Sequence, residues 1–209
     1  MRRLAKEQSW GLEHTEEGAR FRDDELSRFS ATVWFNTTGS LLAAEEREAF
    51  ERFVRAGGGF VAVHAASSSG YDWPFYAALL GALFVGHPPP QPALVRVEDA
   101  AHPATAHLEA SFPWVDEWYN FRALPALVRV LLSVDERSYQ GGILGASHPV
   151  AWCHEKSGGR AFYTALGHEQ SAYADTRFLR HLAGAMAWAA RVELAATSAQ
   201  TEAATTKTK

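Results

Sequence analysis

The chain has 209 residues, of which 47% are hydrophobic and 21% charged, and its 20 Lys and Arg against 24 Asp and Glu give a net charge of −4. This length and balance indicate one globular domain and exclude collagen, coiled-coil and disordered proteins. Because no basic block accumulates and the most apolar stretch, residues 182–190, is too short for a bilayer, we expect neither a nucleic-acid nor a membrane partner.

The N-terminal region begins with charged residues where a signal peptide needs an apolar segment, which predicts a cytoplasmic protein. We expect a short helix over residues 2–8 and another that begins near residue 23. Between them, residues 10–16 alternate Trp, Leu and His with Gly, Glu and Thr, and this period of two predicts a strand.

The next segments predict a parallel βαβ unit. Residues 31–36 are a β-rich apolar run, and residues 42–54 have the spacing of an amphipathic helix that ends at the glycines 57–59. Residues 60–65 form a second continuous apolar strand. Strand, helix, glycine stop and strand in this order predict a right-handed crossover, and therefore an α/β fold.

The second half of the chain contains more turns and prolines. A residue that precedes a proline is disfavoured in the helical conformation, so residues 87–92 are expected to form an extended loop. We expect a single domain over residues 1–192 and a disordered tail over residues 193–209, where no apolar period is present. The other predicted elements are a helix at 73–83, strands at 93–98 and 127–134, a hairpin of 149–153 with 160–165, and a closing helix at 176–190.

Two histidines follow predicted strand ends. His64 comes after the second parallel strand and His168 after the last strand, and ligands of open α/β sheets bind outside the carboxyl ends of strands. An imidazole titrates near neutrality, so either histidine could act as a general acid or base. We expect both side chains to face one cleft, and the alternative for His64 is a ring held by a backbone carbonyl in a tight turn.

The segment from Asp116 through Glu117 and Trp118 to Tyr119 combines two acids with two amphipathic aromatics. Carboxylates accept hydrogen bonds from sugar hydroxyls, and aromatic faces cover the apolar face of a sugar ring. This composition favours a carbohydrate site, and the alternative is a surface loop with ordinary acids.

A divalent metal site is left open by the sequence. No short paired spacing such as H-E-x-x-H is present to support one. A site would need three or more ligands from the set His64, His87, His148, His168 and Glu117.

Covalent catalysis is disfavoured. Residues 64–70, which follow the second parallel strand, have no glycine before their serines and therefore lack the elbow of a serine hydrolase. Cys153 is the only cysteine, lies in the predicted hairpin, and can form neither an internal disulfide nor a thiolate-rich zinc site.

These residues together resemble the ThuA-like family, which is named for trehalose utilisation. The resemblance runs from about residue 4 to residue 190, with the motifs in order and at matching spacing. The matching stretches are 36–39, 57–66, 73–84 with His87, His102-Pro103, 116–119, 148–152 and 158–168.

The resemblance implies a fold similar to class I glutamine amidotransferases: a flavodoxin-like, mainly parallel sheet flanked by helices. It also implies a bacterial role in carbohydrate metabolism, on an oxidised (3-keto) disaccharide such as keto-trehalose. Amidotransfer would be lost, because the elbow cysteine is missing. His64, Glu117 and His168 match motif positions that would line the pocket.

The chain departs from the family at its start. Family members begin with an apolar strand and a Gly-Phe-Arg-His type loop, and neither is present here. In a flavodoxin-like order of 2-1-3-4-5, loss of the first strand leaves residues 10–16 without a partner and residues 32–35 with an open edge. Either the chain is truncated or its start is misassigned, or the strand at 10–16 has moved over to pair directly.

Two functions remain open at this point. The first is a sugar-processing hydrolase, lyase or isomerase with His64, Glu117 and His168 as catalytic residues and a small carbohydrate as partner. The second is a non-catalytic sugar-binding or interaction module on a degenerate amidotransferase-like fold, and homo-oligomerisation is open in both. The candidate substrate-binding residues are Asp116, Trp118, Tyr119, His87 and His148.

Overall fold

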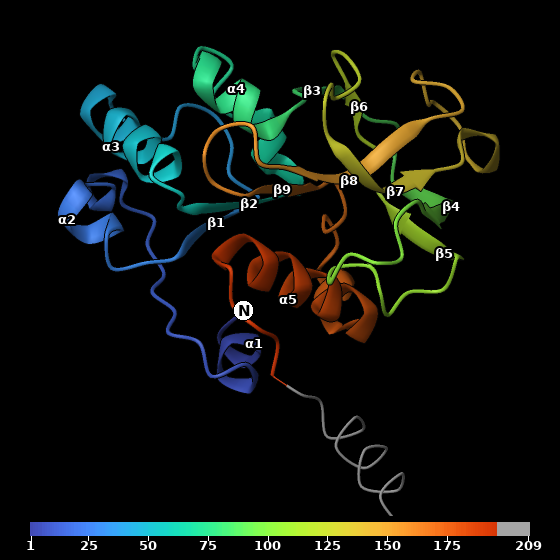
Figure 1. Ribbon diagram of the computed structural model, residues 1–209. Helices are drawn as coiled ribbons and strands as arrows, with labels where there is room; N and C mark the ends of the chain where they lie inside the picture. The colour runs from blue at the N-terminus through green and yellow to red at the C-terminus, as the bar shows by residue number, and fades with distance from the viewer. Residues whose placement is uncertain (196–209) are drawn as a thin grey trace, which may run out of the picture.

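A mixed seven-stranded sheet lies between two helical layers in the computed structural model, which describes residues 1–195 (Figure 1). Helices α3 (Ala44–Arg55) and α4 (Pro74–Leu80) cover one face, and α5 (Thr176–Ala190) covers the other. Helix α1 (Arg2–Glu7) lies on the α5 side. This arrangement confirms the predicted α/β class, whereas the predicted tail lies almost wholly outside the described residues.

Parallel pairing is limited to three strands. β1 (Ala31–Phe35) runs parallel to β2 (Gly59–Val63), and β2 runs parallel to β9 (Ala161–Thr164). Every residue of β2 is buried, as expected for an apolar strand covered on both faces. The predicted crossover unit is therefore present. Gly59 lets α5 approach closely, since a Cβ at this position would lie 2.4 Å from the carbonyl oxygen of Ala189.

The sheet continues from β9 through four antiparallel strands. Next to β9 are β8 (His148–His154), β7 (Arg129–Val134), β4 (Gln91–Val97) and β5 (Ser111–Asp116), in that order. The β8–β9 pair is the predicted hairpin. Because strand direction alternates four times from β9 to β5, the carboxyl end of β5 lies at the same edge of the sheet as the carboxyl ends of β2 and β9.

The remaining elements are short. α2 (Asp23–Leu26) begins near the predicted residue, while β3 (Phe84–Gly86) and β6 (Asn120–Phe121) form a separate antiparallel pair that was not predicted. The 3₁₀ turns are Gly18–Arg20, His64–Ser68, Glu136–Ser138 and Gln170–Ala174.

The predicted strand over residues 10–16 is wrong. These residues are irregular, and nearly all of their side chains are exposed. Glu13 forms ion pairs with Arg20 and Arg28 instead of joining a ladder, and exposed pairs of this kind contribute little to stability. Alternation of apolar and polar residues is not enough to form a strand, because a strand also needs a neighbouring strand with which to form hydrogen bonds.

β1 is an edge strand, and among residues 1–195 no strand pairs with its outer side. It is anchored by Trp34, whose ring centroid lies 5.1 Å from that of Phe50 on α3 and 5.2 Å from that of Tyr76 on α4. Burial of such large side chains contributes roughly 1.5–3 kcal/mol each. The aromatic contacts therefore stabilise the open edge.

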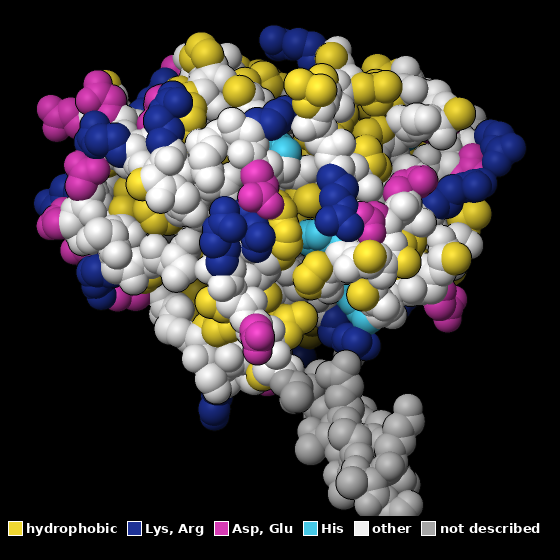
Figure 2. All heavy atoms as spheres, in the orientation of Figure 1, with side chains coloured by type: hydrophobic (Ala, Val, Ile, Leu, Met, Phe, Trp, Pro, Cys, Tyr) yellow, Lys and Arg dark blue, Asp and Glu magenta, His cyan; other side chains and the backbone are white. Residues whose placement is uncertain are grey.

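The surface carries charges of both signs. On the face drawn in Figure 2, basic and acidic side chains lie next to one another. Arg52 and Asp23 form an exposed ion pair, with a separation of 2.9 Å between Nη2 and Oδ2. Within residues 1–195, no helix has both the length and the apolar character needed to cross a membrane.

Candidate functional site

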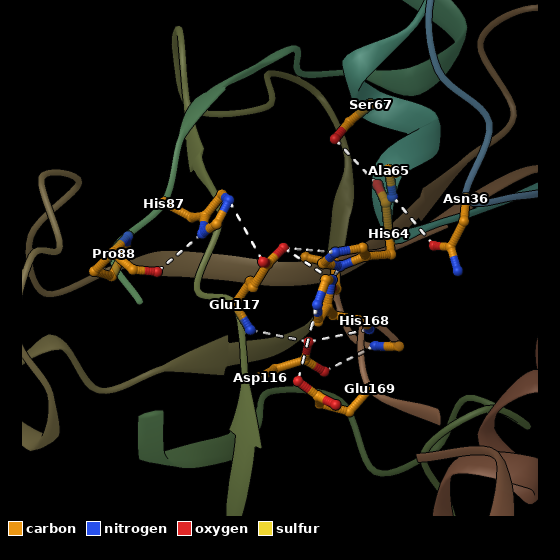
Figure 3. Close-up of polar contacts among 12 residues, drawn as sticks. Asn36, His64, Ala65, Ser67, His87, Pro88, Asp116, Glu117, His168 and Glu169 are labelled. Atoms are coloured by element: carbon orange, nitrogen blue, oxygen red, sulfur yellow. Dashed lines mark hydrogen bonds and ion pairs between the residues drawn. The ribbon is translucent and has the colours of Figure 1, made fainter. Parts of the chain in front are cut away.

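Four segments far apart in the sequence meet at one edge of the sheet (Figure 3). His64 follows β2, His168 follows β9 and Glu117 follows β5, so each comes directly or shortly after the carboxyl end of a strand. His87 precedes β4, whose amino end lies at this same edge because β4 is antiparallel to β5. We call these four residues the edge cluster.

Glu117 is the centre of the edge cluster. Its Oε2 lies 3.3 Å from Nε2 of His64 and 3.0 Å from Nδ1 of His168, and its Oε1 lies 3.6 Å from Nε2 of His87. The rings of His64 and His168 are 5.3 Å apart. The side chain of His64 is only 2% exposed and that of Glu117 12%, against 31% for His87 and 40% for His168. Solvent and ligands therefore reach the cluster from the side of His87 and His168.

His64 is held in one orientation. Its Nδ1 lies 2.6 Å from the carbonyl oxygen of Ala165, which can only accept, so Nδ1 carries the hydrogen and Nε2 points at Glu117. The backbone of His64 has φ +50°, a left-handed conformation that histidine adopts more readily than most residues. Burial lowers the pKa of His64, although the Ala165 carbonyl and the charges of Asp116 and Glu117 oppose that shift. The ring contacts both a backbone carbonyl and a carboxylate.

Asp116 lies beneath the edge cluster and positions it. Its Oδ1 accepts from the backbone N–H groups of Glu117 at 3.0 Å and His168 at 3.1 Å. Its Oδ2 accepts from the N–H of Gly167 at 2.8 Å and the indole of Trp114 at 3.0 Å. Asp116 is fully buried and has four donors, so it connects the end of β5 to the loop after β9 and is not available to a ligand.

Trp118 and His148 also lie away from the accessible side. The Trp118 ring is buried, and its indole N–H donates to the carbonyl of Gln91 at 2.8 Å. Nδ1 of His148 lies 2.8 Å from Glu136, and its Nε2 lies 2.9 Å from the carbonyl oxygen of Tyr119. Both side chains therefore support the backbone under the cluster instead of offering a surface to a sugar.

Tyr119 and His87 lie in the cluster itself. The Tyr119 ring packs 4.1 Å from the ring of His64 and 5.6 Å from that of His87, with Phe84 behind it at 4.2 Å. Burial raises the pKa of Tyr119, and the nearby carboxylates of Glu117 and Asp116 raise it further, so the phenol stays protonated. Tyr119 forms an apolar wall for the imidazoles.

Two residues near the cluster were not predicted as site residues. Asn36, with φ +47°, lies at the end of β1 and its Oδ1 accepts from the N–H of Ala65 at 3.5 Å. The hydroxyl of Tyr173 donates to the carbonyl of Gly167 at 3.0 Å and lies 3.5 Å from Asn36 Nδ2. Asn36 could have been found from the sequence, because an asparagine at a strand end is typical of a left-handed backbone conformation. No sequence pattern indicates Tyr173.

The edge cluster has the donor atoms of a metal site. One atom each from His64, Glu117 and His168 lie within 4.8 Å of one another among the described residues. His148, also a candidate ligand in the sequence, is directed toward Glu136 and the Tyr119 carbonyl and lies outside this group.

A surface depression of about 480 Å³ lies at the opposite edge of the sheet, beside the carboxyl end of β8. Its lining includes Arg129, Cys153 and Trp188. Burial raises the pKa of the Cys153 thiol to about 11, so the thiol is protonated at neutral pH and is a poor nucleophile. The donors and carboxylate gathered at the edge cluster make that region the stronger candidate.

Comparison with known proteins adds family information to this geometry. The family described as ThuA, trehalose utilisation, matches residues 1–189. A ThuA-like protein from Bacteroides uniformis is 28% identical with a TM-score of 0.76, and the match covers 90% of this chain and 80% of that one. A ThuA-like protein from Parabacteroides merdae is 20% identical with a TM-score of 0.73, over 94% of this chain and 86% of that one.

More distant structures share the fold alone. The cytoplasmic protein STM3548 from Salmonella typhimurium is 13% identical with a TM-score of 0.59, and the match covers 89% of this chain and 78% of that one. A search of curated proteins found no match.

Proposed function

The chain belongs to the ThuA family, and from this premise we propose that it is an enzyme of carbohydrate metabolism acting on an oxidised (3-keto) disaccharide or a related sugar. The observation that carries the proposal is the convergence of His64 and His168 on Glu117 at the accessible sheet edge. An enzyme needs these three groups together, whereas a sugar-binding module needs only exposed aromatic faces.

His168 is the proton carrier in this proposal. Its Nδ1 faces Glu117, which leaves Nε2 as the nitrogen for a substrate proton, and it is the most exposed side chain of the cluster. The carboxylate of Glu117 orients the ring and stabilises it when it takes up a proton. A carbonyl makes the neighbouring C–H acidic, so the imidazole of His168 could remove that proton or protonate a leaving glycosidic oxygen.

Hydrolysis by a pair of carboxylates is disfavoured. That chemistry needs one carboxyl as acid and a second as nucleophile or base. Asp116, the nearest acid in the sequence, is buried and accepts four N–H hydrogen bonds. Asp116 therefore cannot act as the partner carboxylate of Glu117.

The non-catalytic alternative has less support. Trp118 and Tyr119 are both buried, which leaves little aromatic face in this segment to cover a sugar. We retain a small carbohydrate as the partner and a cytoplasmic location as parts of the proposal.

The test is incubation of the purified protein with 3-keto-trehalose, other 3-keto glycosides and the parent sugars in D₂O, followed by NMR. We expect deuterium exchange next to the keto group, with or without bond cleavage, and no exchange in the parent sugars. Glu117→Gln and His168→Gln should abolish it. His107→Gln should not, because His107 is outside the edge cluster and its Nε2 lies 2.8 Å from the Arg177 carbonyl oxygen. Sugar binding without exchange or turnover in any oxidised sugar would favour the binding module instead.

A further inference from the structure

The edge cluster has the donor set and the spacing of a metal centre. We propose that Nε2 of His64, Nδ1 of His168 and the carboxylate of Glu117 bind one divalent transition-metal ion of the zinc type, with His87 adjacent. The inference deepens the proposed function: the use of the ion rests on that function, but the binding of the ion does not. In the metal-bound form His168 would act as a ligand, and the ion, in place of the free His168 ring, would polarise the keto group.

The distances between the donor atoms fit a single ion. Zinc holds imidazole nitrogens at ~2.0–2.1 Å and carboxylate oxygens at ~2.0–2.2 Å in a tetrahedron, which sets neighbouring ligand atoms roughly 3.3–3.5 Å apart. Oε2 of Glu117 lies 3.3 Å from the His64 nitrogen and 3.0 Å from the His168 nitrogen. All three donor atoms lie within 4.8 Å of one another, so an ion placed between them would be held by all three after adjustment of the side chains.

The second nitrogens of His64 and of the adjacent His87 have the carbonyl partners that metal ligands need, whereas that of His168 lies near a carboxylate but beyond hydrogen-bond distance. Ligating histidines donate their other N–H to a carbonyl or a carboxylate, which fixes the ring and its tautomer. Nδ1 of His64 lies 2.6 Å from the Ala165 carbonyl, and Nδ1 of His87 lies 2.9 Å from the Pro88 carbonyl. Nε2 of His168 lies 3.8 Å from the carboxylate of Glu169. Each remaining nitrogen points at Glu117.

A cation also satisfies the charge arrangement. With its hydrogen on Nδ1, a neutral His64 ring presents the lone pair of Nε2 to the Glu117 carboxylate. Two electron-rich atoms at this distance repel each other unless a positive charge lies between them. One divalent ion would place a positive charge beside Glu117 and both imidazoles at once. Without an ion, the same effect would require protonation of two adjacent imidazole rings.

The donor set and its exposure select the kind of ion. Imidazole ligands with one carboxylate suit Zn²⁺ and related transition ions, while Mg²⁺ and Ca²⁺ prefer oxygen ligands. Catalytic zinc sites use three protein ligands and keep one position open for water or substrate. The exposed side of the cluster, toward His168 and His87, is where that position would lie.

The experiment measures binding to the full chain, purified without a histidine tag and treated with chelator, by titration calorimetry with Zn²⁺ and with Mg²⁺. We expect one tight Zn²⁺ site per chain and no tight Mg²⁺ site. Co²⁺ in place of Zn²⁺ should give the visible absorption of a four- or five-coordinate ion. Absence of a stoichiometric Zn²⁺ site would overturn the inference.

Three variants locate the site. Glu117→Gln and His168→Gln each remove one ligand, and His64→Asn removes Nε2 while keeping an amide N–H for the Ala165 carbonyl and tolerating the positive φ. Each should weaken Zn²⁺ binding by more than the ~10–100-fold that loss of an outer-shell partner costs. The control His107→Gln should not, and tight binding retained by all three cluster variants would place the ion elsewhere and contradict the proposal.

The outcomes for ion and substrate are separable. Tight Zn²⁺ binding without reaction on any keto sugar would refute the proposed function and leave the metal site standing. Full activity on a keto sugar in chelator-treated protein, with no Zn²⁺ site, would refute the metal centre and leave the function standing.

Discussion

Two groups of histidines in this fold have contrasting surroundings. The edge cluster gathers three imidazoles around Glu117 and is open to solvent at His87 and His168. A second group, His102 and His181, which we call the inner pair, packs around Phe162 with ring distances of 6.1 and 5.4 Å. Within residues 1–195, no carboxylate forms an ion pair with the inner pair. A neighbouring carboxylate and access to solvent therefore distinguish histidines of a candidate site from histidines that only pack in the core.

The inner pair is held by backbone contacts. Nδ1 of His181 lies 2.9 Å from the carbonyl oxygen of Ala104, and Nδ1 of His102 accepts from the N–H of Ala104 at 3.1 Å. Within the described residues, Nε2 of each ring is buried without a hydrogen-bond partner. Burial lowers the pKa of both histidines to about 4, so both are neutral at pH 7. Proton exchange with a substrate is excluded by their burial.

The largest contrast is expected in activity. Glu117→Gln keeps the size of the side chain but removes the charge that orients His168, and we expect kcat/KM on a keto sugar to fall about 10²–10⁴-fold. His181→Asn, which retains an N–H for the Ala104 carbonyl, should change kcat/KM by less than about threefold. Equal losses in the two variants, measured with steady-state kinetics on folded protein, would remove the distinction between the groups.

The next contrast is in packing. A Cβ added at Gly184 of α5 would lie 2.3 Å from the carbonyl oxygen of Pro103, in the loop that carries His102. Gly184→Ala should therefore lower the free energy of unfolding by roughly 2–3 kcal/mol, measured with urea. Gly11→Ala is the control, because nothing lies within 4 Å of its new methyl group, and it should stay within about 0.5 kcal/mol. An unchanged midpoint for Gly184→Ala would mean that the loop and helix are not tightly packed.

The inner pair should also make the protein sensitive to acid. Its folded pKa values of about 4 lie below the ordinary value of 6.5, so the unfolded chain takes up protons that the folded chain refuses. The resulting stability is present above about pH 6.5 and is lost as the pH falls toward 4. We expect a loss of roughly 2 kcal/mol for each of the two histidines between pH 7.5 and pH 5, measured by urea unfolding.

His181→Asn should reduce this acid loss, because it removes one of the two protonation sites. His14→Asn is the matched control, since His14 is exposed, and it should leave the loss unchanged. If the two variants lose the same stability between pH 7.5 and pH 5, the acid sensitivity originates outside the inner pair.

The smallest effect should come from Asp116→Asn. The amide keeps the shape but turns an N–H₂ group toward backbone donors, so Glu117 and His168 lose part of their positioning. We expect kcat to fall about tenfold, with little change in KM, because Asp116 does not contact the ligand. A loss as large as that of Glu117→Gln would instead indicate that Asp116 takes a direct part in the reaction.

Local sequence patterns predicted most of the fold because they depend on neighbours in the chain. The apolar runs of β1 and β2, the amphipathic spacing of α3, the hairpin of β8 and β9, and the closing helix α5 are all present. β5 was missed, although Phe112, Trp114 and Asp116 alternate with exposed residues along it. The same alternation at residues 10–16 gave no strand, because pairing requires a partner edge that the local pattern does not contain.

The sequence by itself determined the α/β class, the family resemblance, and the choice of His64, Glu117 and His168 as candidates. The tertiary structure decided which neighbours face one another. Successive residues at a strand end point to opposite sides, so Asp116 is directed inward to four N–H donors while Glu117 is directed outward to the imidazoles. The meeting of β2, β5 and β9 at one edge depends on strand order across the whole sheet, and such long-range pairing cannot be read from local periodicity.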